Sequence, residues 1–199
     1  SGQPDLQMAA ARTLALVAQA RGDEAAARKA LSAMAQLARD AALPPTAQRH
    51  AQAYRILLAL MAGDPDEARY LAGDSPALDE IGALPDYLIL SLACARLLLA
   101  EQRPAEAYEL LRKREARLQA AGFTAAHIDT RAMQALAAPT DQEAARFVAE
   151  ALALAVPEGY VRPFVDLGRP MAALLREAAG RGVTVDFIGR LLAAFRASE

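Results

Sequence analysis

Cysteine and long hydrophobic runs are both scarce in this sequence of 199 residues. Cys94 is the single cysteine, so no disulfide forms within the chain and a reducing compartment is expected. It lies in the apolar run of residues 87–100, where a buried structural thiol is the usual finding. Arg96 interrupts this run, which is also shorter than the about 20 residues that span a bilayer. We expect a cytoplasmic protein that does not cross a membrane.

An excess of basic charge is also missing. The sequence has 22 Lys and Arg against 24 Asp and Glu, for a net charge of -2. A surface that follows a nucleic acid backbone normally carries a basic excess, because it neutralises phosphates. The densest basic run, residues 112–117, includes Glu115 and is expected to be a solvated helix face. We therefore expect this chain to make no direct contact with nucleic acid.

Catalytic and metal-binding patterns are absent as well. His50 and His127 are the two histidines, and neither has a partner at a spacing typical of zinc ligands. The sequence has no Gly-x-Ser-x-Gly nucleophile turn and no Gly-x-x-x-x-Gly-Lys-Ser/Thr phosphate loop. Acidic groups such as Asp64, Asp66 and Glu67 fit a helix start, where negative charge is favourable. We expect no enzymatic activity, no metal and no cofactor in this chain.

The residues that are abundant are typical of helices. Hydrophobic residues make up 54% of the chain, aromatic residues 5%, and tryptophan is absent. Alanine and leucine dominate, and both are good helix formers that let helices pack closely. The alternation of apolar and polar residues that marks strands is not found. The sequence therefore predicts an all-α protein.

One turn pattern recurs four times along the chain. Each copy has a turn, an acidic helix start and then an alanine, and the copies begin at Gly22, Gly63, Gln102 and Pro139. The differences between these positions are 41, 39 and 37 residues, so the repeat is about 40 residues long. Helical periodicity on both sides of each turn predicts a series of antiparallel helical hairpins.

Capping signals place a helix directly after two of these turns. Asp64 is predicted to cap a helix that has Pro65 at its first position and Glu67 near its start. Thr140 and Glu143 have the spacing of a capping box. Both signals support the hairpin prediction.

Small residues recur where the paired helices must approach each other, as at Ala15, Ala18 and Ala27 in the first copy. This pattern resembles tetratricopeptide repeats, although the consensus aromatic residues are missing and the period exceeds about 34 residues. The resemblance implies a right-handed superhelix, or solenoid, of about four hairpins. Residues 1–156 are expected to form it.

In helical-repeat solenoids the first helix of each hairpin lines a concave, ligand-binding surface. Ten residues fall on this surface in the tetratricopeptide frame: Arg12, Leu16, Gln19, His50, Tyr54, Leu57, Arg96, Leu99, Asp129 and Met133. Polar groups among apolar ones suit a small polar ligand or a peptide. We expect Arg12, His50, Tyr54 and Arg96 to carry recognition. The alternative is that His50 and Tyr54 pack between hairpins and Arg96 pairs with a carboxylate.

Residues 157–199 are expected to be a connector and a pair of capping helices in the same domain. Pro157 and Gly159 are predicted to interrupt the preceding helix. Two shorter helices are expected near residues 170–179 and 185–197.

The connector contains three residue types that are enriched at interfaces, namely Tyr160, Arg162 and Phe164. They could contact another domain or a second copy of the chain. The alternative is that they are buried within a packed connector.

A longer motif links the end of the chain to a known family. Residues 151–168 read Ala-Leu-Ala-Leu-Ala-Val-Pro-Glu-Gly-Tyr-Val-Arg-Pro-Phe-Val-Asp-Leu-Gly, followed by Leu174-Leu175 and by Leu191-Leu192-Ala193-Ala194-Phe195. This phrase resembles the end of the sensor region in MalT-type, LuxR-family bacterial transcription activators. The resemblance implies a chain cut from a longer protein, with an ATP-binding domain before it and a DNA-binding helix-turn-helix after it.

The function implied by this resemblance is a regulatory sensor or oligomerisation module. It would bind a small-molecule inducer or a regulatory protein in the concave groove and contact other domains of the same chain or a second copy. ATP would belong to the missing N-terminal domain. The alternative is an interaction scaffold that binds a peptide or protein and responds to no inducer.

Overall fold

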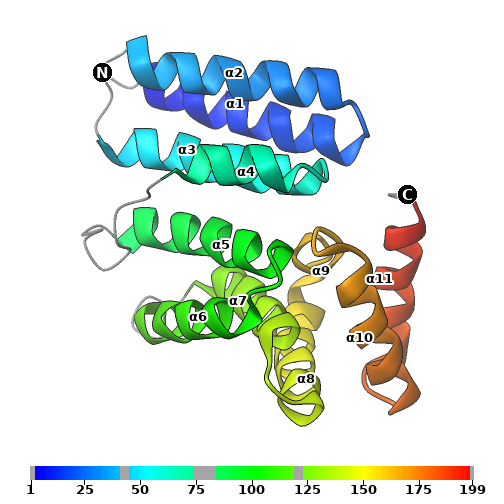
Figure 1. The fold of residues 1–199 in the computed structure, drawn as a ribbon. Coiled ribbons are helices and arrows are strands. Elements are labelled where there is room, and N and C mark those ends of the chain that lie inside the picture. Colours follow the sequence, from blue (N-terminus) through cyan, green and yellow to red (C-terminus); the bar gives the residue numbers. More distant parts are fainter. Residues whose placement is uncertain (1–2, 41–44, 74–83, 119–122, 198–199) are drawn as a thin grey trace. The chain divides into compact units, whose positions relative to one another are not determined.

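The computed structural model describes residues 3–40, 45–73, 84–118 and 123–197. These residues form eleven helices and no strand, which confirms the all-α prediction (Figure 1). The helices are α1 (Gln3–Ala20), α2 (Glu24–Asp40), α3 (Pro45–Met61), α4 (Pro65–Ala72), α5 (Leu84–Ala100), α6 (Pro104–Leu118), α7 (Thr124–Ala137), α8 (Asp141–Glu158), α9 (Arg162–Val165), α10 (Gly168–Gly180) and α11 (Val185–Ala197). Within these ranges, no helix is long and apolar enough to cross a membrane.

The chain divides into two compact units, residues 1–100 and residues 101–199. The boundary predicted at residues 156 and 157 lies inside the second unit and stays a prediction. The first unit contains α1 to α5, and the second contains α6 to α11. The right-handed superhelical course across all four repeats also stays a prediction.

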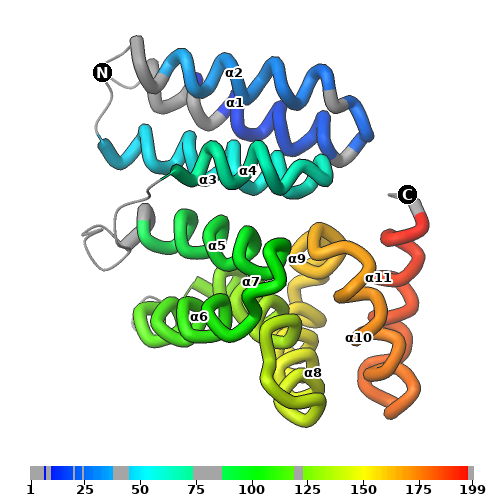
Figure 2. The backbone as a smooth tube through the Cα atoms, viewed as in Figure 1, coloured from blue at the N-terminus to red at the C-terminus, as the bar shows by residue number. Residues whose placement is uncertain are grey.

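The first unit is built from helical hairpins (Figure 2). Helix α1 packs against α2, α3 packs against α4, and α3 also contacts α2 and α5. Buried alanines at the contacts, such as Ala15, Ala53 and Ala68, are inaccessible to solvent. Their small side chains let the helix backbones approach closely, as the small-residue pattern predicts.

The repeat turns share one backbone conformation in three of the four copies. Gly22, Gly63 and Gln102 have φ angles of 72°, 77° and 60°. After the first two turns an aspartate caps the next helix: Asp23 Oδ1 accepts from the Ala26 N–H, and Asp64 Oδ1 accepts from the Glu67 N–H, both at 2.9 Å. The predicted Asp64 cap is confirmed.

The second unit has a larger aliphatic and aromatic core. Helices α7 and α8 form a hairpin, and α9, α10 and α11 pack around its end. Phe147, Phe164, Leu175 and Ile188 belong to one cluster of buried side chains that joins α8 to α11. The Glu143 N–H donates to Thr140 Oγ1 at 3.2 Å, as expected for a capping box.

The expectation that Pro157 interrupts the preceding helix is wrong. Helix α8 continues through Pro157 to Glu158 and ends at Gly159, which has φ 69° in the left-handed region. Pro157 is the penultimate residue of the helix, so its missing N–H removes a single hydrogen bond near the end. Helices α10 and α11 confirm the predicted pair of shorter helices.

Candidate functional site

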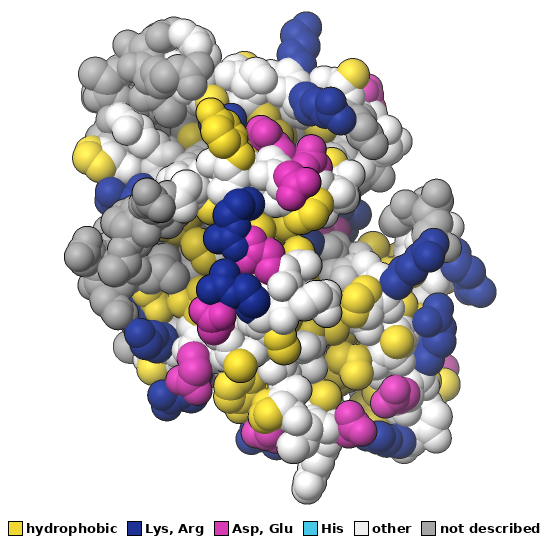
Figure 3. All heavy atoms as spheres, in the orientation of Figure 1, with side chains coloured by type: hydrophobic (Ala, Val, Ile, Leu, Met, Phe, Trp, Pro, Cys, Tyr) yellow, Lys and Arg dark blue, Asp and Glu magenta, His cyan; other side chains and the backbone are white. Residues whose placement is uncertain are grey.

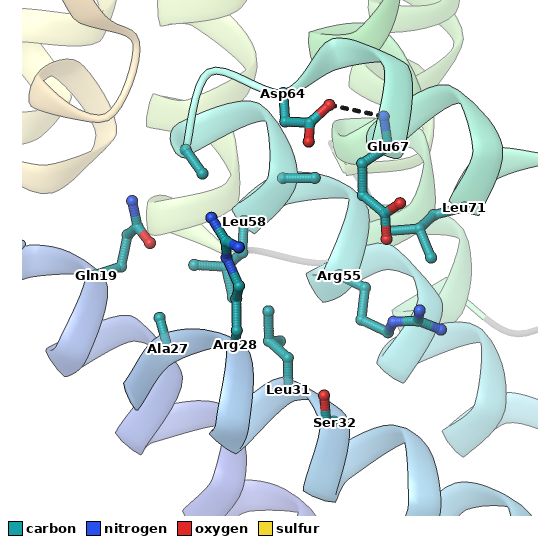
Figure 4. A pocket seen from close by; sticks show the side chains of 12 residues that line it. Gln19, Ala27, Arg28, Leu31, Ser32, Arg55, Leu58, Asp64, Glu67 and Leu71 are labelled. Atoms are coloured by element: carbon teal, nitrogen blue, oxygen red, sulfur yellow. Dashed lines mark hydrogen bonds between the residues drawn. The ribbon is translucent and has the colours of Figure 1, made fainter. Parts of the chain in front are cut away.

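A cavity of about 420 Å³ lies in the first unit between helices α2, α3 and α4, with one residue from α1 (Figure 4). Its twelve lining residues are Gln19, Ala27, Arg28, Leu31, Ser32, Arg55, Leu58, Ala59, Ala62, Asp64, Glu67 and Leu71. The two hairpins α1–α2 and α3–α4 both contribute to its wall. The volume falls within the range of small-ligand sites, roughly 300–1,000 Å³.

The apolar part of the lining is aliphatic. Leu58 is buried, and Leu31 and Leu71 are half-buried. Leu31 also packs against the small core cluster that contains Met34. Among the lining residues that the structure describes, none carries an aromatic ring. The lining can therefore receive an aliphatic group, but it offers no ring for stacking.

The charged part of the lining is balanced. Arg28 comes from α2 and Arg55 from α3, whereas Asp64 and Glu67 stand at the start of α4. In Figure 4 the Arg28 side chain extends between Gln19 and the start of α4, and Arg55 lies on the side of Glu67 and Leu71. Two cationic and two anionic residues thus line one small space, with Arg55 half-buried and the other three exposed.

Arg55 is the most informative of these groups. It is half-buried, and within the described residues it makes neither an ion pair nor a hydrogen bond. A guanidinium group has five N–H donors, and removing it partly from water is costly unless the donors find acceptors. The cavity beside it is where an acceptor from a ligand would lie.

The predicted recognition residues Arg12 and Tyr54 do lie together. Arg12 Nη1 is 3.5 Å from Tyr54 Oη, and the guanidinium carbon is 5.5 Å from the ring centroid. His50 lies one turn before Tyr54 on α3 and is also half-buried. Gln19 is the one predicted residue that lines the cavity.

The other predicted residues are divided between the units. Leu16 is half-buried and Leu57 is 7% exposed, so Leu57 belongs to the core of the first unit. Arg96 and Leu99 are half-buried on α5. In the second unit, Asp129 is half-buried and Met133 is buried. Leu16, Leu57, Arg96, Leu99, Asp129 and Met133 complete the set of ten residues predicted for the concave surface. A single concave surface that joins all ten residues stays a prediction.

Sequence reasoning missed most of the cavity because it assigned recognition to the first helix of each hairpin. Arg28 and Ser32 come from α2, and Glu67 comes from α4, which are second helices. The charge at Asp64 and Glu67 was explained by the helix start alone. Arg55 directly follows Tyr54 in the sequence, so the predicted set missed it by one position.

The second unit contains a network of buried charges. Arg114 is 2% exposed, and its Nε donates to Thr130 Oγ1 at 2.8 Å. Glu115 is 8% exposed and lies 3.1 Å from Arg131 Nη2 and 3.4 Å from His127 Nδ1. Helices α6 and α7 are thereby joined by polar contacts.

This network corrects the expectation that residues 112–117 form a solvated face. Arg112 is exposed and pairs with Glu109 at 3.2 Å, as expected, but Arg114 and Glu115 point into the core. Helical periodicity explains the burial of Arg114, because this residue, two positions after Arg112, lies on roughly the opposite side of α6. On the face of the molecule shown in Figure 3, acidic and basic side chains are interspersed over the described surface.

The connector residues have different environments. Phe164 is fully buried in the core of the second unit, and Tyr160 packs against the same core. Arg162 is exposed and forms an ion pair with Asp166. Packing within the connector therefore accounts for Phe164. The predicted contact of these residues with another domain stays a prediction.

Cys94 lies partly buried on α5. Burial raises the pKa of its thiol to about 11, and the charge of Arg69 opposes this change in part. The thiol is therefore protonated near neutral pH, as a structural cysteine requires. In the part of the chain that the structure describes, no group of His, Cys, Asp or Glu residues is arranged to hold a metal ion.

Helices paired across turns that recur about every 40 residues define a tetratricopeptide-like helical-repeat protein. Comparison with known families gives a match to the MalT-like TPR region over residues 1–181. The chain belongs to this family, which confirms the resemblance to the sensor region of MalT-type regulators. It is accordingly a helical sensor or interaction region. A comparison with curated proteins gives no match.

Proposed function

We propose that this chain is the effector-sensing module of a LuxR-type transcription activator and that it binds a small molecule in the cavity of the first unit. The observation that carries the proposal is the half-buried Arg55, which has no ion pair or hydrogen bond within the described residues and lines a pocket of about 420 Å³ with both aliphatic and charged side chains. Oriented polar groups among apolar ones are what small-ligand sites have in common. ATP binding and DNA binding would belong to other domains, and we expect no catalysis in this one.

The position of the cavity suggests how binding would be transmitted. Arg28 belongs to the hairpin α1–α2, whereas Arg55, Asp64 and Glu67 belong to the hairpin α3–α4. A ligand held by both hairpins favours the arrangement in which all its contacts are made. Its differential affinity for that arrangement shifts the population of the regulator between resting and active, self-associating states.

A second candidate function is recognition of a protein or peptide without any inducer. Leu14 and Val17 on α1 are 63% and 41% exposed, and Tyr70 on α4 is 80% exposed. Exposed apolar groups of this size on one unit are compatible with a protein partner. The cavity is not needed for this function, so the two proposals differ in what mutation of the cavity would do.

A thermal-shift screen of the chain against sugars, amino acids, aromatic acids and nucleotides tests the proposed function. A ligand that binds the folded state alone stabilises it by about 2.7 kcal/mol at one hundred times its Kd. We expect at least one compound to raise the Tm, and Arg55→Gln to abolish the rise. Arg176→Gln, an exposed position on α10, is the matched control and should retain the response.

Two outcomes would count against small-molecule sensing in this cavity. One is that no compound raises the Tm at millimolar concentration. The other is that a compound raises the Tm equally in the wild type and in Arg55→Gln, which would place its site elsewhere.

A further inference from the structure

We infer that the ligand of this cavity is an aliphatic amino acid in its zwitterionic form, either free or as a short peptide. The inference rests on the proposed function and adds the chemical class of the effector. It follows from the chemistry of the lining, in which two guanidinium groups, two carboxylates and three leucine side chains border a space of about 420 Å³.

The ligand carboxylate is assigned to the arginines. Arg55 makes no ion pair or hydrogen bond with any residue that the structure describes, and its guanidinium can hold a carboxylate through two parallel N–H donors. Arg28 lines the same space from the neighbouring hairpin. Gln19 and Ser32 add neutral polar groups to this wall. The two guanidinium groups therefore favour an anionic group on the ligand.

The ligand ammonium is assigned to the start of α4. The side chain of Glu67 forms no ion pair within the described ranges, and Asp64 uses Oδ1 to accept from the Glu67 N–H. Both carboxylates line the cavity, so a ligand that brought only negative charge would face repulsion from them. A ligand with an ammonium as well as a carboxylate matches both signs of charge in the lining.

The remaining ligand surface is aliphatic. Leu31, Leu58 and Leu71 line the cavity, and they match a branched aliphatic side chain. The described lining offers no aromatic ring on which a sugar or a nucleobase could stack. Its formal charges also cancel, which disfavours polyanions such as nucleotides. The cavity volume lies near the lower end of the range for ligand sites, so a small molecule is indicated.

Isothermal titration of the chain with leucine and its analogues tests the inference. Leucinamide lacks the carboxylate, 4-methylpentanoate lacks the ammonium, and glycine lacks the side chain. We expect leucine to bind and each analogue to bind roughly tenfold more weakly or worse, because each leaves charged or apolar groups without a partner. The dipeptide Leu-Leu distinguishes the two sources: tighter binding than leucine assigns the site to peptides, and weaker binding assigns it to the free amino acid.

Two variants link each ligand group to its protein partner. Arg55→Gln should weaken leucine binding and remove the preference for leucine over leucinamide. Glu67→Gln should weaken leucine binding and remove the preference for leucine over 4-methylpentanoate. Asp66→Asn, in the same first turn of α4 but outside the lining, and Arg176→Gln should leave both preferences unchanged. Arg55→Lys keeps the charge and provides a second variant if Arg55→Gln does not fold.

The outcomes separate this inference from the proposed function. Equal binding of leucine and leucinamide, or no binding of leucine and Leu-Leu while another compound binds in an Arg55-dependent manner, would overturn the amino-acid assignment and leave the sensing function intact. If no compound binds at all, both proposals fail. A preference for leucine that both Gln variants retain would also overturn the assignment, because the charges would then have other partners.

Discussion

At the scale of single residues, the ion pairs in the second unit involve charged groups that are costly to bury. Arg131 joins Glu115 at 3.1 Å to Glu150 at 2.9 Å, and its guanidinium carbon lies 5.5 Å from the ring centroid of Phe147. Glu115 is 8% exposed, and its Oε2 has no hydrogen-bond partner among the residues that the structure describes. Burial of the Glu115 carboxylate is therefore tolerated only if its cationic partner, Arg131, is present.

Arg131→Ala is therefore expected to destabilise the second unit by about 3 kcal/mol, because it leaves Glu115 in the core without its arginine. Urea unfolding followed by circular dichroism measures this loss. Arg112→Ala removes an exposed pair with Glu109 and should change the free energy of unfolding by less than about 0.5 kcal/mol. Similar effects of the two substitutions would show that the network contributes no more than a surface ion pair.

At the scale of the elements, the third repeat turn departs from the first two in one respect. The corresponding positions of the first and second turns are glycines, but the third has Gln102, whose φ of 60° is in the left-handed region. A residue with a Cβ atom in this region costs roughly 1–2 kcal/mol. The third turn therefore carries strain that the other two avoid.

Gln102→Gly is expected to stabilise the protein by about 0.5–1 kcal/mol, since relief of this strain exceeds the added entropy of glycine in the unfolded chain. The reverse change, Gly63→Gln, is the matched control and should destabilise by a similar amount. A Cβ atom at Gly63 would meet no atom within 4 Å, so that loss would come from the backbone alone. Differential scanning calorimetry of both variants measures the shifts in Tm, and a lower Tm for Gln102→Gly would contradict this account.

The elements themselves were largely predictable from the sequence, whereas the cavity was not. Local signals gave the repeat turns, the caps at Asp64 and Thr140 and the two final helices, because neighbouring residues determine these features. The cavity depends on how two hairpins pack, and periodicity does not specify that Arg28 and Arg55 will line the same space. The burial of Arg114 was missed for a related reason, since a charged run does not reveal which side of a helix will be covered.

At the scale of the whole molecule, each of the two units contains a hydrophobic cluster of its own residues. One joins Ala11, Met34 and Ala51 in the first unit, and the other extends from Ile128 to Leu191 in the second. In helical-repeat proteins each element is stabilised mainly by its neighbours, so local damage stays local unless the repeats are strongly coupled. This matters for sensing, because binding energy gained in the first unit reaches the second only through such coupling.

Two core substitutions test this division, and hydrogen exchange followed by mass spectrometry detects it. Leu175→Ala, at a fully buried position of the second unit, should cost about 2–5 kcal/mol and accelerate amide exchange in α8, α10 and α11. Ile56→Ala, fully buried in the first unit, should accelerate exchange in α1 to α4 instead. If amide exchange rises equally in both units for both variants, the 199 residues unfold as one cooperative body. An effector bound in the cavity would then stabilise α11 as strongly as α3. Exchange confined to the damaged unit would mean that the signal must travel as a change in how the hairpins are arranged.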